Sequence, residues 1–383
     1  MIKKTTLIFL TLCLVVSFAS LCPAADTIKF GFNAPLTGFA AADGKSSSEG
    51  AKLAVKQINA AGGVLGKQVE LVIYDDQAKP ANAIPIANKL IGKDKVVVGI
   101  SGSYSGPTRS SAGVFQEAGI PYISAYAIHP DITRAGNMVY RTGLLGTVQG
   151  RAGAKLVGDM MGKKNVVIIT LQNDFGKSLA AGFKSVAADY GIQVIAEYQY
   201  SMKDRQFGSL VAKVKADKPD AIYASGYYFT CGPLVSQLRA GGVDAPVIGQ
   251  EGYDGQKFIE IAGPAAEGVL ITTTLDRDSK EKEAREFIQA FEKQAGYPAD
   301  MVSASAHTAV KVAAAAIERA GSTDPEKIRQ AIAKTSYKAS SGLIRFNKLG
   351  EVMKPVQVQI VRDGRWHYYA VIDDPELLTP PEE

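Results

Sequence analysis

The sequence is poor in the residues that catalytic and metal sites most often use. Among 383 residues it has three cysteines and three histidines, and two of the cysteines fall in the first 25 residues. If that segment is removed, Cys231 is the only thiol, which excludes a disulfide framework and a cysteine metal site. His129, His307 and His367 form no pair at metal-ligand spacing and have no obvious nucleophile as partner. We therefore expect no metal, no cofactor and no enzymatic reaction.

Motifs for binding phosphate or activating a nucleophile are also missing. No Gly-x-Gly-x-x-Gly follows the first predicted strand, and there is no Walker lysine loop. The segment GSYSG (102–106) is not a nucleophile elbow, because Tyr104 occupies the place of the serine. The formal charge of +5 comes with no basic run, so we expect no nucleic-acid partner. These absences favour binding over catalysis.

The N-terminal segment is typical of a secretory signal peptide. Two lysines precede a mostly apolar run from Leu7 to Leu21, and small residues follow at Ala24 and Ala25. The run is shorter than the roughly 20 residues that span a bilayer, which disfavours an uncleaved membrane anchor. A lipid anchor on Cys22 is not expected, because a lipid-attachment signal requires a small residue where this sequence has leucine. We expect residues 1–25 to be removed and the protein to reside in the periplasm.

The rest of the chain alternates between two kinds of segment. From Ile28 onward, short β-branched runs alternate with amphipathic segments, and the alternation restarts after YRTGLLGTVQG (140–150). Such alternation predicts parallel sheets with helices on both faces, here two doubly wound, Rossmann-like α/β lobes. Segments 96–126 and 220–251 share one plan: a strand, a Ser-Gly-aromatic loop, a Gly-Pro helix start, a turn and a second strand. The lobes therefore resemble products of a divergent duplication.

The C-terminal part has too few strands for a third lobe. We expect its helices to cross back to the first lobe and its last strands to return to the second. The predicted boundaries are 26–145 with 275–352 for the first lobe and 146–274 with 353–383 for the second. We interpret the last ten residues, DPELLTPPEE, as a frayed end.

Ligands of open α/β sheets bind where strands end and helices begin, which selects two loops in each lobe. In SGSYSGP (101–107), Pro107 fits the first helical position, and free backbone amides beside the hydroxyls of Ser103 and Ser105 could hold a carboxylate or phosphate. Alternatively, these serines only cap the helix. The next loop, 124–130, can offer backbone groups, and His129 is interpreted as a turn residue.

The second lobe places an acid and two tyrosines at the matching positions. Tyr227 and Tyr228 correspond to the first loop, and Glu251 in GQEG corresponds to the second. We predict that a zwitterion binds between the lobes, with its ammonium group on Glu251 and Tyr227 closing over it. A solvated loop acid is the alternative. Phe175 could form an apolar wall or be an ordinary core residue.

Several segments, in one order, resemble the leucine/isoleucine/valine-binding proteins, the substrate-binding components of branched-chain amino-acid ABC transporters. They include IKFGFNAPLTG (28–38), GIPYISAYAIHPDIT (119–133), YRTGLLGTVQG (140–150), SGYYFTCGPLVSQLRAGG (225–242) and GQEGYDG (249–255). The resemblance implies a type I periplasmic-binding fold: two lobes joined by three crossovers, closing on a ligand about a hinge near residues 140–145. It also implies an ABC permease with ATPase subunits as partner, and we expect a monomer.

The resemblance places the carboxylate contact on Ser105, the ammonium contacts on Tyr227 and Glu251, and the aromatic wall on Phe175. Two departures stand out: Ile128 replaces a threonine that contacts the amino acid, and Asp43 falls where the family has a pocket tyrosine. An aromatic acid, an amide or another small acid is therefore the alternative ligand, and a sensory receptor the alternative role. The candidate ligand-binding residues are Tyr104, Ser105, Ser124, Ala125, Tyr126, Ala127, Ile128, Phe175, Tyr227 and Glu251.

Overall fold

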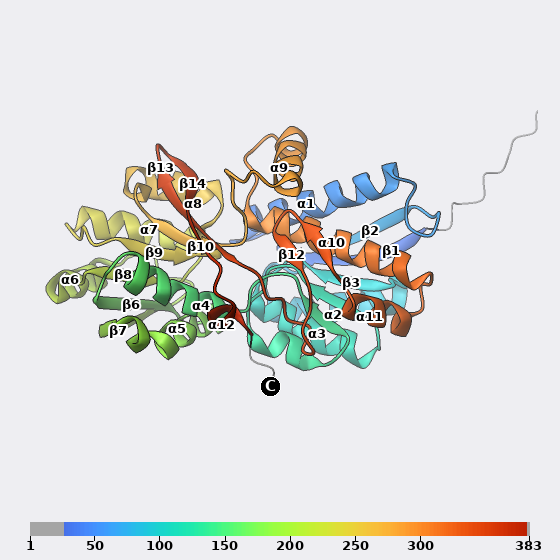
Figure 1. Cartoon of the computed structure of the whole chain (residues 1–383), viewed down its shortest axis with the longest axis horizontal. Helices are drawn as coiled ribbons and strands as arrows, with labels where there is room; N and C mark the ends of the chain where they lie inside the picture. Colours follow the sequence, from blue (N-terminus) through green and yellow to red (C-terminus); the bar gives the residue numbers. More distant parts are fainter. Residues whose placement is uncertain (1–26, 381–383) are drawn as a thin grey trace, which may run out of the picture.

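The structure, a computed structural model, describes residues 27–380 and consists of two α/β lobes side by side (Figure 1). The predicted signal peptide lies outside the described residues. Within the described range, no helix has the length and apolar character needed to cross a membrane.

The first lobe is built on a parallel five-stranded sheet with the order β2-β1-β3-β4-β5. Its central strands carry apolar side chains that are buried on both faces, as expected for a covered parallel sheet. The strands are β1 (Ile28–Ala34), β2 (Val69–Asp75), β3 (Val98–Ser101), β4 (Tyr122–Ser124) and β5 (Val139–Arg141). The helices of this lobe are α1 (Ala41–Ala60), α2 (Pro80–Lys89), α3 (Ser105–Glu117), α9 (Lys282–Ala295), α10 (Met301–Ala320) and α11 (Pro325–Ala333).

The second lobe has a seven-stranded sheet with the order β14-β13-β10-β9-β8-β6-β7. Five strands are parallel: β6 (Asn165–Leu171), β7 (Gln193–Tyr200), β8 (Ala221–Ala224), β9 (Val247–Gln250) and β10 (Leu270–Thr273). The hairpin of β13 (Val356–Arg362) and β14 (Arg365–Ile372) adds antiparallel to β10. The helices are α4 (Gly146–Lys155), α5 (Asp174–Val186), α6 (Gly208–Asp217), α7 (Tyr228–Ala240) and α8 (Gln256–Ala262).

The chain passes between the lobes three times: from β5 to α4, from β10 to α9, and from the small sheet of β11 (Tyr337–Ala339) and β12 (Gly342–Ile344) to β13. Helix α10 enters the first lobe by packing along α1. This arrangement confirms the predicted type I periplasmic-binding fold. The residue boundaries of the two lobes stay a prediction.

Three local predictions were wrong. Helix α3 begins at Ser105, so Pro107 is the third helical residue; its missing N–H still costs no bond, because the first four N–H groups of a helix have no internal partner. Helix α7 begins at Tyr228, five residues before Pro233, because Thr230 caps its start by accepting a hydrogen bond from the Tyr227 amide (3.1 Å). The last ten residues are not simply frayed, since Pro375–Leu378 forms the short helix α12, in which Leu378 is buried.

Candidate functional site

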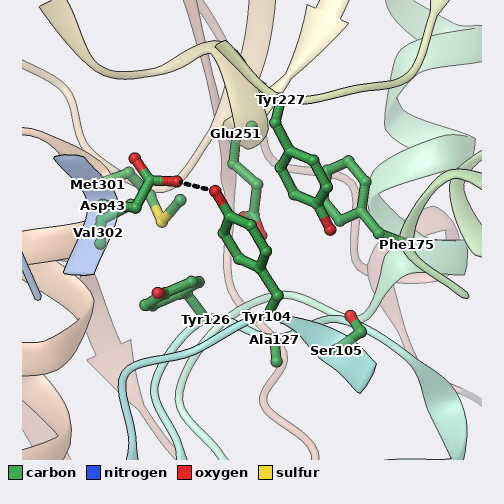
Figure 2. A pocket seen from close by; sticks show the side chains of 11 residues that line it. Asp43, Tyr104, Ser105, Tyr126, Ala127, Phe175, Tyr227, Glu251, Met301 and Val302 are labelled. Atoms are coloured by element: carbon green, nitrogen blue, oxygen red, sulfur yellow. Dashed lines mark hydrogen bonds between the residues drawn. The ribbon is translucent and has the colours of Figure 1, made fainter. Parts of the chain in front are cut away.

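One cavity lies between the two lobes and receives residues from both (Figure 2). Its volume is about 20 Å³, far below the ~300–1,000 Å³ typical of small-molecule sites, so side chains fill most of it in this arrangement. The first lobe contributes the starts of α1, α3 and α10 and the loop after β4, and the second contributes α5 and the segments after β8 and β9. The lining residues are Asp43, Tyr104, Ser105, Tyr126, Ala127, Phe175, Tyr227, Glu251, Gly252, Met301 and Val302.

The start of α3 forms the donor-rich wall of the cavity. Ser105 is the first residue of this helix, so the neighbouring backbone amides have no partner within it. The Ser105 hydroxyl accepts a hydrogen bond from the Ile128 amide (3.3 Å), which leaves its own proton available for donation. The Tyr126 hydroxyl donates to the Gly102 carbonyl (2.7 Å) and ties the two loops together. This wall has the chemistry to hold an anionic group.

A buried ion pair fixes the loop after β4. Arg141 is fully buried at the end of β5, and its Nε lies 2.9 Å from Oε2 of Glu351. The guanidinium also donates to the carbonyls of Ala127 and His129, the latter at 2.7 Å. Such a pair is stable in a core because its remaining hydrogen-bonding groups are satisfied. Sequence reasoning missed this support, although a charged residue ending an apolar strand was a visible signal.

Three candidate residues of this loop do not line the cavity. The Ser124 hydroxyl donates to the Ala127 carbonyl (3.1 Å), and the Ala125 amide donates to Ser101 in the neighbouring strand (2.9 Å). Ile128 is fully buried, and its backbone amide donates a hydrogen bond to the Ser105 hydroxyl. Their backbone and side chains shape the loop, while Tyr126 and Ala127 reach the cavity.

Glu251 lies on the opposite side, at the end of β9. Its side chain is 3% exposed, so it is not a solvated loop acid. Burial raises the pKa of Glu251 to about 8, opposed by a hydrogen bond that Gln149 donates (3.1 Å) and by the more distant positive charge of Lys354. A Cβ on the adjacent Gly252 would come within 2.1 Å of the Gly226 carbonyl. Glycine there lets the two loops of the second lobe touch.

Aromatic rings join the two lobes. Tyr227 stacks on Tyr104 of the first lobe, with ring centroids 4.2 Å apart and planes 6° apart, and on Phe175 at 4.7 Å. Tyr228 does not line the cavity, but its hydroxyl donates to the Phe39 carbonyl across the lobes (3.0 Å). These contacts describe a closed arrangement in which the Tyr104 ring lies at the centre of the cavity (Figure 2).

The third wall comes from the starts of α1 and α10. Asp43 is 8% exposed, and Oδ2 accepts a hydrogen bond from the Tyr104 hydroxyl (2.7 Å). Burial raises the pKa of Asp43 to about 7; the Tyr104 bond opposes this, and the charges of Asp300 and Asp254 add to it. Met301 and Val302 lie beside Asp43 (Figure 2). Sequence reasoning noted Asp43 as a departure but missed Met301 and Val302.

Comparison with known proteins agrees with this geometry. A family model described as Periplasmic binding protein matches residues 27–365. The chain is 33% identical to the Leucine-, isoleucine-, valine-, threonine-, and alanine-binding protein of Pseudomonas aeruginosa, over 88% of this chain and 90% of that protein. It is 34% identical to Leu/Ile/Val-binding protein homolog 3 of Brucella melitensis, over 89% and 92%. The crystal structure of LivJ from Streptococcus pneumoniae in complex with isoleucine is similar, with a TM-score of 0.86 and 27% identity over 90% of this chain and 99% of that one.

Proposed function

Because this chain belongs to the periplasmic binding protein family, we propose that it is an exported solute-binding protein that captures a branched-chain or other aliphatic α-amino acid between its lobes. It delivers the amino acid to an inner-membrane ABC permease with its ATPase subunits, as a monomer, and performs no reaction on it. Residues 1–25 serve as the cleavable signal peptide that directs it to the periplasm. The names of the relatives and the isoleucine complex support the amino-acid class.

The observation that carries this proposal is the buried carboxylate of Glu251 facing the cavity. Among the described residues, its one hydrogen-bond partner is the neutral amide of Gln149. A buried carboxylate without a cationic partner is costly, so the site favours a ligand that brings one. The α-ammonium group of an amino acid provides the charge and up to three donors. An aromatic acid without an amine would leave this cost in place.

The start of α3 is the complementary end of the proposed site. Its free backbone amides and the available proton of Ser105 suit the carboxylate of the ligand, and the helix dipole favours negative charge there. A zwitterion therefore has a partner on each lobe. Because the two partners belong to different lobes, only the closed arrangement satisfies both ends of the ligand.

Closure is the proposed mechanism. The first lobe, 26–145 with 275–352, and the second, 146–274 with 353–383, move as two bodies about the crossover near residues 140–145. The ligand shifts the population toward the closed form because it contacts both lobes only there. The permease then recognises the closed form.

The test is calorimetric titration of the mature protein after unfolding, removal of bound ligand and refolding. We expect leucine to bind with micromolar or tighter affinity, which corresponds to about 8 kcal/mol. The matched control ligand is 4-methylpentanoate, which lacks only the amine and should not bind. Binding of 4-hydroxybenzoate without leucine would refute the amino-acid assignment and identify an aromatic-acid carrier.

A further inference from the structure

The cavity has a second buried acid that the two ends of a simple amino acid do not use. Asp43 lies in the first turn of α1, on the first lobe, whereas Glu251 comes from the second (Figure 2). Within residues 27–380, the Asp43 carboxylate has one hydrogen-bond partner, the Tyr104 hydroxyl, which bonds Oδ2. Its Oδ1 is left without a protein donor. A carboxylate oxygen of a cavity-lining residue without a protein donor favours a donor from the ligand.

Two neighbouring acids, Asp300 and Asp254, have a structural role, and their carboxylates receive more hydrogen bonds than that of Asp43. Asp300 accepts hydrogen bonds from the Ser46 hydroxyl (2.7 and 2.6 Å) and from the Ser303 amide (2.8 Å). Asp254 pairs with Arg277 (2.6 Å) and also accepts from the Thr273 hydroxyl and the Met301 amide, both at 2.7 Å. Each of them accepts hydrogen bonds at both carboxylate oxygens and lies outside the cavity lining. Asp43 accepts a hydrogen bond at one oxygen only and lines the cavity.

Asp43 lines a wall of the cavity to which neither end of the amino acid is assigned. The ammonium group is assigned to Glu251 and the carboxylate to the start of α3. Asp43, Met301 and Val302 lie together on one side of Tyr104, opposite Phe175 and Tyr227 (Figure 2). This third wall therefore combines apolar surface with one acceptor. It suits a short branched side chain that carries a hydrogen-bond donor.

We infer that Asp43 is a specificity-determining residue of this site and selects an α-amino acid whose side chain carries a hydroxyl donor, so that threonine binds in preference to its isostere valine. The inference rests on the proposed function, because it assumes that the two ends of the ligand bind as described. The methyl group of threonine packs on Met301 and Val302, and its hydroxyl donates to Asp43. Valine fills the same volume but leaves the carboxylate oxygen desolvated and unpaired.

The test compares threonine and valine by calorimetry on the same ligand-free mature protein. At pH 8, where Asp43 with a pKa of about 7 is mostly ionised, we expect threonine to bind about tenfold to a hundredfold more tightly, as for a hydrogen bond to a charged acceptor. In Asp43→Leu, which replaces the carboxylate by an apolar group of similar shape, valine should bind at least as tightly as threonine. Asp43→Asn, which keeps the shape and one acceptor, should retain a smaller preference and provides a second variant if Asp43→Leu does not fold.

Glu260→Gln is the matched control, because it removes a carboxylate that is half exposed and pairs with Lys257 on the surface. It should leave both affinities unchanged. Equal or tighter binding of valine by the wild type, or a threonine-to-valine ratio that Asp43→Leu does not change, would overturn the inference while leaving the amino-acid function intact. Failure of leucine, valine and threonine alike to bind would overturn both.

Discussion

Binding of leucine should release a proton from Glu251. In the closed arrangement the carboxyl group is buried and receives one neutral hydrogen bond, and burial raises its pKa to about 8. Near pH 7 most of the ligand-free closed protein therefore holds a proton there. An ammonium group at hydrogen-bond distance lowers the pKa of a carboxyl by about 1–3 units. The bound form is then largely ionised, and the closed fraction of the ligand-free protein releases most of one proton per molecule at pH 7.

The same reasoning gives the sign of the pH dependence. Because the ionised carboxylate binds the ammonium group, affinity rises with pH between the bound and free pKa values, by up to about tenfold for each unit. The rise should end near pH 8, where the free carboxyl is ionised as well. Glu251→Gln removes both the charge and the titration. It should weaken leucine binding by about 1.5 kcal/mol or more and remove the part of the pH dependence that comes from Glu251, while Asp43, whose pKa is raised to about 7, still titrates.

Calorimetry in two buffers with different ionisation enthalpies measures the proton release directly. At pH 7 the wild type should show a heat that depends on the buffer, and in Glu251→Gln this dependence should be smaller. Glu260→Gln serves as the surface control and should behave as the wild type does. Equal heats in both buffers for the wild type, together with an affinity independent of pH from 6 to 8, would refute the assignment of the ammonium group to Glu251.

Three further substitutions test the walls of the site. Ser105→Ala should weaken leucine binding by about 1 kcal/mol or more and lower the melting temperature slightly, because the Ile128 amide loses its acceptor; equal affinity would mean that the backbone amides alone hold the carboxylate. Gly252→Ala should lower the melting temperature because its Cβ meets a carbonyl at 2.1 Å, whereas Gly113→Ala, which meets nothing within 4 Å, should not. Arg141→Leu leaves Glu351 buried and unpaired and should cost about 3–5 kcal/mol in urea unfolding; a cost below 1 kcal/mol would show that the pair is dispensable.

Much of the fold could be predicted because the alternation of strands and helices is visible locally in the sequence. This alternation usually produces a parallel sheet covered by helices on both faces. The loops at strand ends followed from the same pattern, and the correspondence between the lobes pointed to Tyr227 and Glu251. Pro233 misled the prediction of α7, since a proline usually marks a helix start and here lies inside the helix. The capped start of the helix lies upstream of the proline, where Thr230 accepts from the Tyr227 amide, although Pro233 removes one internal hydrogen bond.

The residues of the third wall of the cavity could not be predicted from the sequence, because their position depends on how two distant helices pack. Met301 and Val302 reach the site because α10 returns from the second lobe and packs along α1, and no local pattern specifies that docking. The hydrogen bond between Asp43 and Tyr104 likewise joins positions 61 residues apart. The departure at Asp43 was visible in the sequence, but its meaning depends on which groups the fold brings to it.

The contacts between the lobes suggest why closure responds to the ligand. The stack of Tyr104 on Tyr227, the bond from Tyr228 to Phe39 and the exposed pair of Arg109 and Asp174 (3.1 Å) together supply about 2–3 kcal/mol by usual magnitudes. Against this, closing forces the Glu251 carboxyl to stay protonated at pH 7 although its ordinary pKa is 4.5, which costs about 3 kcal/mol.

Closure without ligand is therefore close to balanced. The ammonium group of an amino acid removes the cost of burying Glu251 and adds a charge-assisted bond, whereas a carboxylic acid without an amine does neither. A few kcal/mol of differential affinity is enough to move such an equilibrium almost completely to the closed form. The acid that opposes ligand-free closure is thus the same group that makes closure selective for an amine.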